Sequence, residues 1–195
     1  MKKKIQVLIA EDDYLVLMSL RLCLEKLGYE VIAEATDGLQ AVEQALQKKP
    51  DLILIDINMP YLDGIEALKN INDHYVVPSI IITGYSESKL VKRALEAGIF
   101  GYLVKPVDAR ELAPAIDVAL DRFEEFKKLS NDLQDTKAAL EARKYIEKAK
   151  GILMESLHLT EAEAMKYLQK KSRTKNRKIV VIAKEIIKAN QLLKE

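Results

Sequence analysis

The first 120 residues predict an α/β fold with a five-stranded, doubly wound parallel sheet. Short apolar segments alternate with longer amphipathic ones, which is the order of strands and helices in such a sheet. The clearest apolar segment, Leu52–Ile55, is too short for a helix and apolar throughout, as expected of a strand buried on both faces. It is followed by a carboxylate, Asp56, and open α/β sheets place their sites at the carboxyl ends of their strands.

Each predicted element has a local signal of its own. Gly28 ends the first helix, Pro50 ends the second, and the capping pattern Asp108-x-x-Glu111 begins the fifth. The strands are expected at 5–10, 30–35, 51–56, 79–83 and 101–104, and the helices at 14–27, 37–49, 63–73, 87–97 and from 108 onward. This alternation favours a parallel sheet with helices on both faces.

The composition is that of a soluble globular protein, because 49% of the residues are apolar and 31% are charged. Cys23 is the only cysteine, so no intramolecular disulfide is expected, and a reducing cytoplasm is the expected location. The apolar run after Lys4 meets Glu11 too early for a signal peptide. No run approaches the roughly 20 apolar residues of a membrane span.

The net charge of +1 is unevenly distributed along the chain. Residues 1–120 carry a net charge of −5, residues 121–142 carry −2, and residues 143–195 carry +8. We therefore expect an α/β domain at 3–120, a helical linker at 121–142 and a small basic domain at 143–195. A basic domain of this kind is suited to a polyanionic partner.

Acidic residues follow two of the predicted strands. Glu11 and Asp12 follow the first strand and Asp56 follows the third. Like charges at close range disfavour the ionised forms unless a cation lies among them. The expected cation is Mg²⁺, which prefers oxygen ligands, held by Asp12, Asp56 and a backbone carbonyl near Asn58. It would orient a phosphoryl group for attack by the Asp56 carboxylate.

Two further strand ends carry residues that suit a phosphoryl group. Thr83 offers a hydroxyl, Lys105 offers a cation, and Lys105-Pro106 is a candidate cis peptide. Taken singly, an aspartate after a strand is usually a turn residue or a helix cap, and a lysine there is usually solvated. The combination at four strand ends favours a phosphoryl-transfer site over these simpler explanations.

Residues 3–120 resemble the receiver domain of two-component response regulators, which has a flavodoxin-like fold. The matching residues are Glu11-Asp12, Asp56, Leu62-Asp63-Gly64, Thr83 and Lys105-Pro106. The resemblance implies that Asp56 accepts a phosphoryl group from a sensor histidine kinase. It also implies a magnesium site made by Asp12, Asp56 and the main chain at Asn58, with Glu11 acting mainly through water.

The same resemblance assigns roles to the remaining matched positions. Thr83 and Lys105 would contact the phosphoryl group, and Tyr102 would be an aromatic switch that turns inward when the Thr83 hydroxyl moves toward the phosphate. The domain would take up and lose its phosphoryl group without being a turnover enzyme. Phosphorylation adds about −1.5 to −2 charges, which would shift an existing conformational equilibrium.

The fifth helix has no evident end, because residues 108–150 contain no glycine and only Pro114 near the start. Apolar residues at spacings of three and four, Phe126, Leu129, Leu133 and Leu140, favour a coiled coil that pairs two chains, with Thr136 in the same frame. The alternative is a solvated, charged linker helix. We expect a homodimer that forms on phosphorylation.

The tail predicts three short helices around a small core. Tyr145–Leu157 continues or restarts a helix, Thr160-x-x-Glu163 is a capping box for a helix that ends near Lys171, and a last apolar helix begins at Ile179. The run 170–178 between the last two helices has six basic residues among nine and no acidic one. It is either a solvated loop or a site for a phosphate backbone. Tyr145 and Tyr167 either belong to the core or stack on unpaired bases.

Residues from about 127 to 193 resemble the ANTAR output domain of transcription antitermination regulators. The resemblance is carried by Ile146-x-x-Ala149-Lys150-Gly151-Ile152-Leu153-Met154, Thr160-Glu161-x-Glu163-Ala164-Met165-x-x-Leu168, Asn176-Arg177-Lys178-Ile179 and Ile182-Ala183. The family implies binding to RNA hairpins in a nascent leader, which prevents a terminator from forming. The RNA contacts are assigned to Lys150, Arg173, Lys175, Arg177 and Lys178.

These observations predict a phosphorylation-controlled, RNA-binding antiterminator. A DNA-binding response regulator is one rival, although the apolar start of the last helix at Ile179–Ile182 suits a recognition helix poorly. A receiver-based signalling adaptor with a protein-binding tail is the other. Binding of hairpin RNA and of duplex DNA distinguishes the three.

Overall fold

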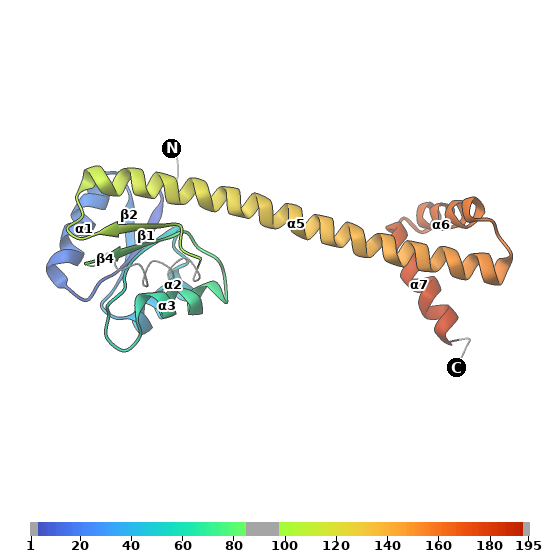
Figure 1. The fold of residues 1–195 in the computed structure, drawn as a ribbon, viewed down its shortest axis with the longest axis horizontal. Helices are drawn as coiled ribbons and strands as arrows, with labels where there is room; N and C mark the ends of the chain where they lie inside the picture. Colours follow the sequence, from blue (N-terminus) through green and yellow to red (C-terminus); the bar gives the residue numbers. More distant parts are fainter. Residues whose placement is uncertain (1–3, 85–97, 193–195) are drawn as a thin grey trace. The chain divides into compact units, whose positions relative to one another are not determined.

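The computed structural model describes residues 4–84 and 98–192, and the predicted helix at 87–97 lies outside these ranges. The strands are β1 (Gln6–Ala10), β2 (Glu30–Ala35), β3 (Leu52–Asp56), β4 (Ser79–Thr83) and β5 (Gly101–Val104). The helices are α1 (Tyr14–Lys26), α2 (Gly38–Lys48), α3 (Gly64–Asn72), α5 (Ala109–Leu157), α6 (Glu161–Lys175) and α7 (Ile179–Leu192) (Figure 1). The chain divides into two compact units, Met1–Lys127 and Lys128–Glu195.

The first unit contains the predicted parallel sheet, with strand order β2-β1-β3-β4-β5. Leu17, Leu20 and Leu24 of α1 pack with Leu112 and Ile116 of α5 on one face. Helices α2 and α3 pack on the other face. Because β3 and β4 are covered on both faces, all their residues are buried. The predicted α/β fold class is confirmed.

The strand register alone brings the predicted site residues together. Ala10 pairs with Ile55, so the next residues, Glu11 and Asp56, lie side by side at the carboxyl ends of two adjacent strands. Thr83 pairs with Val104 on the other side of β3, and Lys105 follows directly. The four strand ends therefore meet at the carboxyl edge of the sheet.

The second unit contains the end of α5 together with α6 and α7. Its core includes Ala149 and Leu153 of α5, Leu168 of α6 and Ala183 of α7. The predicted capping box is present at Thr160, whose backbone N–H and hydroxyl bond the Glu163 carboxylate. Helix α5 runs without interruption to Leu157, so the tail continues the long helix and does not restart it.

The structure corrects the predicted basic loop. Helix α6 continues to Lys175, and only residues 176–178 connect it to α7. Asn176 ends the helix in the left-handed conformation (φ 49°), and Ser172 Oγ donates a hydrogen bond to the Arg177 carbonyl. Lysine and arginine are good helix formers and suit a helix carboxyl end, so the basic run extends the helix.

Candidate functional site

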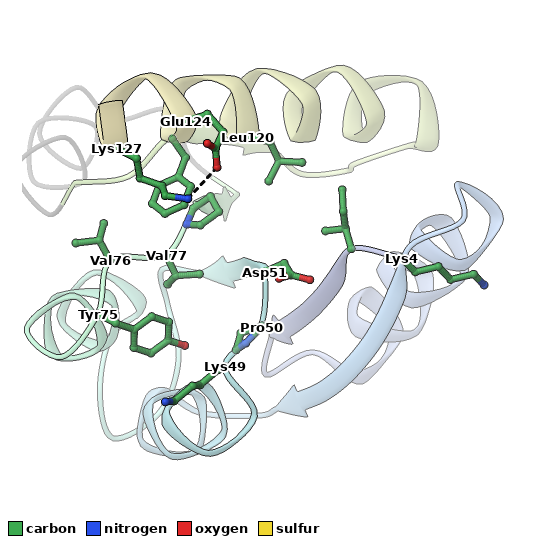
Figure 2. A pocket seen from close by; sticks show the side chains of 13 residues that line it. Lys4, Lys49, Pro50, Asp51, Tyr75, Val76, Val77, Leu120, Glu124 and Lys127 are labelled. Atoms are coloured by element: carbon green, nitrogen blue, oxygen red, sulfur yellow. Dashed lines mark hydrogen bonds and ion pairs between the residues drawn. The ribbon is translucent and has the colours of Figure 1, made fainter. Parts of the chain in front are cut away.

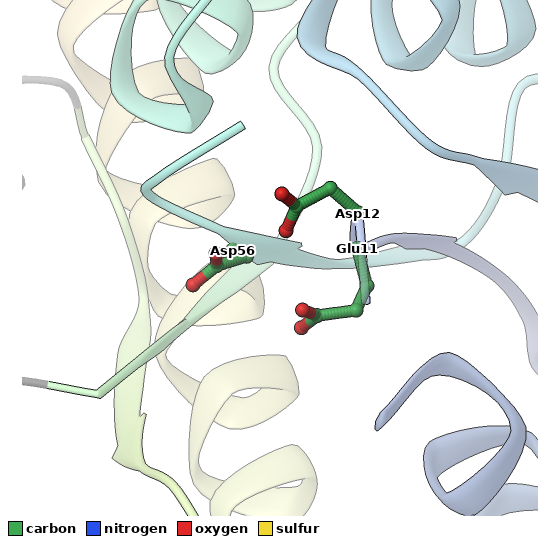
Figure 3. Close-up of side chains that lie close together, drawn as sticks. All are labelled: Glu11, Asp12 and Asp56. Carbon is green, nitrogen blue, oxygen red and sulfur yellow. The ribbon is translucent and has the colours of Figure 1, made fainter. Parts of the chain in front are cut away.

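Three carboxylates meet where β1 and β3 end. Glu11, Asp12 and Asp56 each place one oxygen so that the three atoms lie within 4.8 Å of one another (Figure 3). Glu11 and Asp56 are buried, at 1% and 4% exposure, whereas Asp12 is exposed. The cluster therefore has a solvent-facing side and a buried side.

Lys105 supplies the positive charge beside this cluster. Its Nζ donates a hydrogen bond to Glu11 Oε1 at 2.7 Å and lies 3.3 Å from Asp56 Oδ1. Glu11 Oε2 is buried and has no hydrogen-bond partner among the described residues, and the buried Asp56 Oδ1 is met by the charge of Lys105. Buried oxygens of this kind are costly unless a cation or a donor meets them.

The electrostatics agree with this geometry. Burial raises the pKa of Glu11 and of Asp56 above their ordinary values, and the charge of Lys105 offsets only part of that effect. Burial alone would lower the pKa of Lys105, but its hydrogen bond to Glu11 and the charge of Asp56 raise it. The lysine is therefore charged, and the site is short of positive charge.

Local backbone features hold the acidic residues in place. Asp13 caps α1 by accepting from the N–H groups of Leu15 and Val16, so the chain turns directly after Asp12. Gly64 packs so closely that a Cβ there would lie 2.0 Å from the Asp56 carbonyl oxygen. A side chain at position 64 would therefore displace the end of β3.

The other predicted site residues lie at the same edge or next to it. Thr83 is buried at the end of β4, and Asn58 is exposed in the turn after Asp56. Tyr102 lies on β5 beside Ile81 and is 54% exposed. The Lys105-Pro106 peptide is cis.

Comparison with known proteins identifies both units. The sequence model of the response regulator receiver domain matches residues 7–117, and that of the ANTAR domain matches residues 134–187. The chain belongs to the response regulators with a receiver domain and a C-terminal ANTAR domain. None of the helices in its described part has the length and apolarity needed to cross a membrane.

Individual relatives agree with this assignment. The transcriptional regulatory protein PdtaR of Mycobacterium tuberculosis is 42% identical over 165 residues, which cover 85% of this chain and 80% of PdtaR. Among solved structures, the signal receiver domain of a modulated diguanylate cyclase from Desulfovibrio desulfuricans is 36% identical with a TM-score of 0.59, covering 66% of this chain and 99% of that domain. A CheX-CheY-BeF3-Mg complex from Borrelia burgdorferi is 30% identical with a TM-score of 0.56, covering 57% of this chain and 86% of the matched one.

The five residues predicted to contact RNA fall into two groups by their burial in the ANTAR domain. Lys150 is 8% exposed and donates to Glu147 Oε2 at 3.0 Å and to Glu161 Oε1 at 2.6 Å. Its charge thus ties α5 to the first turn of α6. This placement favours a structural role for Lys150 over an RNA contact.

The remaining four predicted contacts are exposed near the junction of α6 and α7. Lys175 and Arg177 both pair with Glu185 of α7, Lys175 at 3.0 Å. Among the described residues, Arg173 and Lys178 have no carboxylate partner. Arg173 and Lys178 are thus available to bind an anion, whereas Lys175 and Arg177 are both paired with Glu185.

Three carboxylate partners were missed by the sequence analysis. The spacing of Glu147 and Lys150 on one helix would have suggested their pair. Glu161 and Glu185 reach their lysines from other helices, and the sequence gives no signal for such pairs.

The two tyrosines of the tail, Tyr145 and Tyr167, are half-buried. Lys184 Nζ lies 4.5 Å from the Tyr145 ring centroid, and Lys171 Nζ lies 5.6 Å from that of Tyr167.

Proposed function

We propose that this response regulator accepts a phosphoryl group on Asp56 from a sensor histidine kinase and thereby controls RNA-hairpin binding by its ANTAR domain, as a transcription antiterminator. The observation that carries the proposal is the buried Asp56 carboxylate, grouped with Glu11 and Asp12 and placed 3.3 Å from Lys105. A cytoplasmic location follows from these partners. The receiver spans 3–120, the linker 121–142 and the output domain 143–195.

The acidic cluster fits Mg²⁺. Asp12, Asp56 and the main-chain carbonyl of Asn58 would hold the ion, and Glu11 would act mainly through water. The three grouped carboxylates and the buried Glu11 Oε2, which has no hydrogen-bond partner among the described residues, support this assignment, as does the magnesium in the name of the related CheY complex. When bound, the ion neutralises charge on the cluster and on the incoming phosphoryl group.

The residues of the chain then carry out one phosphoryl transfer, from the kinase to Asp56. An Asp56 oxygen attacks the phosphorus of the donor phosphohistidine, so a P–O bond forms as the P–N bond breaks. Lys105 and the Thr83 hydroxyl donate hydrogen bonds to phosphoryl oxygens, and Tyr102, which is exposed before transfer, turns inward behind Thr83. Water later hydrolyses the acyl phosphate, so the receiver resets itself without turning over a substrate.

The long helix carries the proposed dimer contact. Leu129, Leu133 and Leu140 are each more than half exposed and repeat at coiled-coil spacing, with Thr136 in the same frame. The Phe126 ring packs against Phe100 with centroids 5.9 Å apart. The pairing seam between two copies therefore starts at Leu129, and phosphorylation raises the dimer population.

The RNA surface is assigned to Arg173 and Lys178. Lys175 and Arg177 would also contact RNA once their ion pairs with Glu185 break. The rival DNA-binding function would require the start of α7 to face a major groove. Ile182 and Ala183 are buried instead, and Ile179 packs against the same core. This burial favours RNA over DNA as the ligand.

Two measurements test the proposal. Labelled acetyl phosphate with Mg²⁺ should modify the wild-type chain and leave Asp56→Asn unlabelled; persistent labelling of that variant refutes the acceptor assignment. Filter binding should then show salt-sensitive retention of hairpin RNA, but not of duplex DNA, by the phosphorylated full chain. Retention of duplex DNA would favour a DNA regulator, and no retention would favour a protein-binding adaptor.

A further inference from the structure

A cavity of about 570 Å³ lies at the amino-terminal edge of the receiver sheet, the edge opposite the acidic cluster (Figure 2). Ile5, Asp51 and Pro78 line it from just before β1, β3 and β4, and Leu120 and Phe123 line it from α5. Its volume is in the range of small-molecule sites, roughly 300–1,000 Å³. Neither phosphoryl transfer nor RNA binding uses this cavity.

The apolar part of the cavity wall is held by its own contacts. The Phe123 ring packs edge-on against Phe100, with centroids 5.3 Å apart. The Tyr75 hydroxyl donates to the Ala45 carbonyl at 2.8 Å, and two prolines, at positions 50 and 78, stiffen the rim. The cavity is thus formed before any ligand arrives, which lowers the cost of binding.

Three lysines line the cavity, at positions 4, 49 and 127, and the last two lie on one side of its opening. Figure 2 shows Lys127 and Lys49 on either side of Tyr75 and Val76. Lys49 follows α2 in the left-handed conformation (φ 50°), and no carboxylate of the described chain pairs with it. Among the described residues, the carboxylate partner of Lys127 is exposed Glu124, at 3.1 Å, which is a weak interaction that an anion can replace. Lys127 Nζ also lies 5.4 Å from the centroid of the Phe123 ring.

Two acidic residues line the cavity: Glu124, which pairs with Lys127, and Asp51. The Asp51 carboxylate accepts a hydrogen bond from the backbone N–H of Gln6 at 3.0 Å, so it is engaged with the start of β1. Figure 2 shows it apart from Lys49 and Lys127. An anionic group is therefore attracted to the lysine side, while the apolar part of a ligand meets Leu120 and Phe123.

We propose that this cavity binds a small amphipathic anion, with a flat apolar body inside it and one carboxylate or phosphate at its opening, on the side that carries Lys49 and Lys127. Such a ligand touches α5 at Phe123 and Lys127, the last helical turns of the receiver unit. It would stabilise the receiver by binding the folded state alone.

The probe is 2-naphthoate, titrated into the ¹⁵N-labelled full chain, with uncharged 2-naphthol as the matched ligand. Saturable amide shifts are expected at residues 49, 51, 75–77 and 120–127, with about tenfold tighter binding of naphthoate, which corresponds to about 1.4 kcal/mol. Lys49→Gln and Lys127→Gln should each weaken naphthoate binding severalfold. Lys48→Gln and Lys128→Gln, neighbours that do not line the cavity, should leave it unchanged.

Three results would overturn the proposal. They are equal binding of naphthoate and naphthol, equal effects of Lys49→Gln and Lys48→Gln, or shifts confined to other residues. All four variants change exposed lysines, so amide dispersion should report a folded chain in each case. Asp56→Asn should bind naphthoate normally, which separates this site from the phosphorylation site.

Discussion

Lys105 Nζ donates a 2.7 Å hydrogen bond to Glu11 Oε1, joining residues that are 94 positions apart in the chain. The bond links the ends of β1 and β5 across the carboxyl edge of the sheet. Lys105 is thus the counter-charge of the carboxylate cluster before it contacts any phosphoryl group. The proposed phosphorylation of Asp56 would require the lysine to share or exchange this partner.

Replacing Lys105 by methionine should tighten Mg²⁺ binding and abolish efficient labelling of Asp56. The substitution leaves three carboxylates without their cation, so a divalent ion gains attraction. The affinity should rise at least about fivefold, because two unit charges about 4 Å apart interact by roughly 1 kcal/mol even in water. Titration calorimetry measures this change. Lys69→Met, which removes an exposed lysine from the pair with Glu66, is the control. Unchanged magnesium affinity in Lys105→Met would show that Lys105 does not compensate the cluster.

Asp56→Asn should raise the melting temperature of the receiver by a few degrees in EDTA. Burial raises the pKa of Asp56 in the folded state, so the ionised carboxylate destabilises the fold. The difference between the two proteins should be absent below the ordinary pKa of about 3.9 and grow as pH rises through the raised value. Thermal unfolding followed between acidic and neutral pH measures it.

Saturating Mg²⁺ provides the internal control for this experiment. The ion binds the folded wild type, so its stability should rise while that of Asp56→Asn changes less. The advantage of the variant should then shrink or reverse. If the advantage is the same with and without Mg²⁺, Asp56 is not a ligand of the ion.

Lys150→Met should destabilise the ANTAR domain. The hydrogen bonds from Lys150 lower the pKa of Glu161, so their contribution is present above the ordinary glutamate value of about 4.3 and is lost as pH falls through the lowered one. The difference in melting temperature from wild type should therefore shrink in acid. Lys148→Met, an exposed lysine on the same helix, should melt like wild type. Equal melting of both variants would contradict a structural role for Lys150.

The sequence predicts the sheet and the acidic site well because both depend on local patterns. Apolar runs and their caps locate the strands to within a residue or two, and register then brings Glu11 and Asp56 together. The pairs Lys105–Glu11 and Lys175–Glu185 depend on side chains that approach from separate elements, which no periodicity encodes. The prediction that α6 ends near Lys171 was wrong because basic residues suit a helix end as well as a loop; the helix continues to Lys175, and Asn176 caps it.

The proposed dimer has a testable orientation. With Leu129 and Leu133 in the seam, a parallel, in-register pair places Asp132 of one copy opposite Lys137 of the other. Asp132→Lys should weaken the phosphorylated dimer by about tenfold, because two attractive pairs become repulsive ones. The double swap Asp132→Lys/Lys137→Asp should restore it. Sedimentation equilibrium gives these constants, and a double swap as weak as the single one would exclude this register.

The salt dependence of hairpin binding separates cations that touch phosphate from those that do not. Each lost phosphate contact reduces the slope of log affinity against log salt by about 0.7–0.9. Arg173→Gln should show this reduction, whereas Arg173→Lys, which keeps the charge, should retain the slope. Glu185→Gln should steepen it, because Lys175 and Arg177 lose their shared carboxylate and become available to the RNA. A slope insensitive to both Arg173→Gln and Glu185→Gln would place the RNA on another face of the domain.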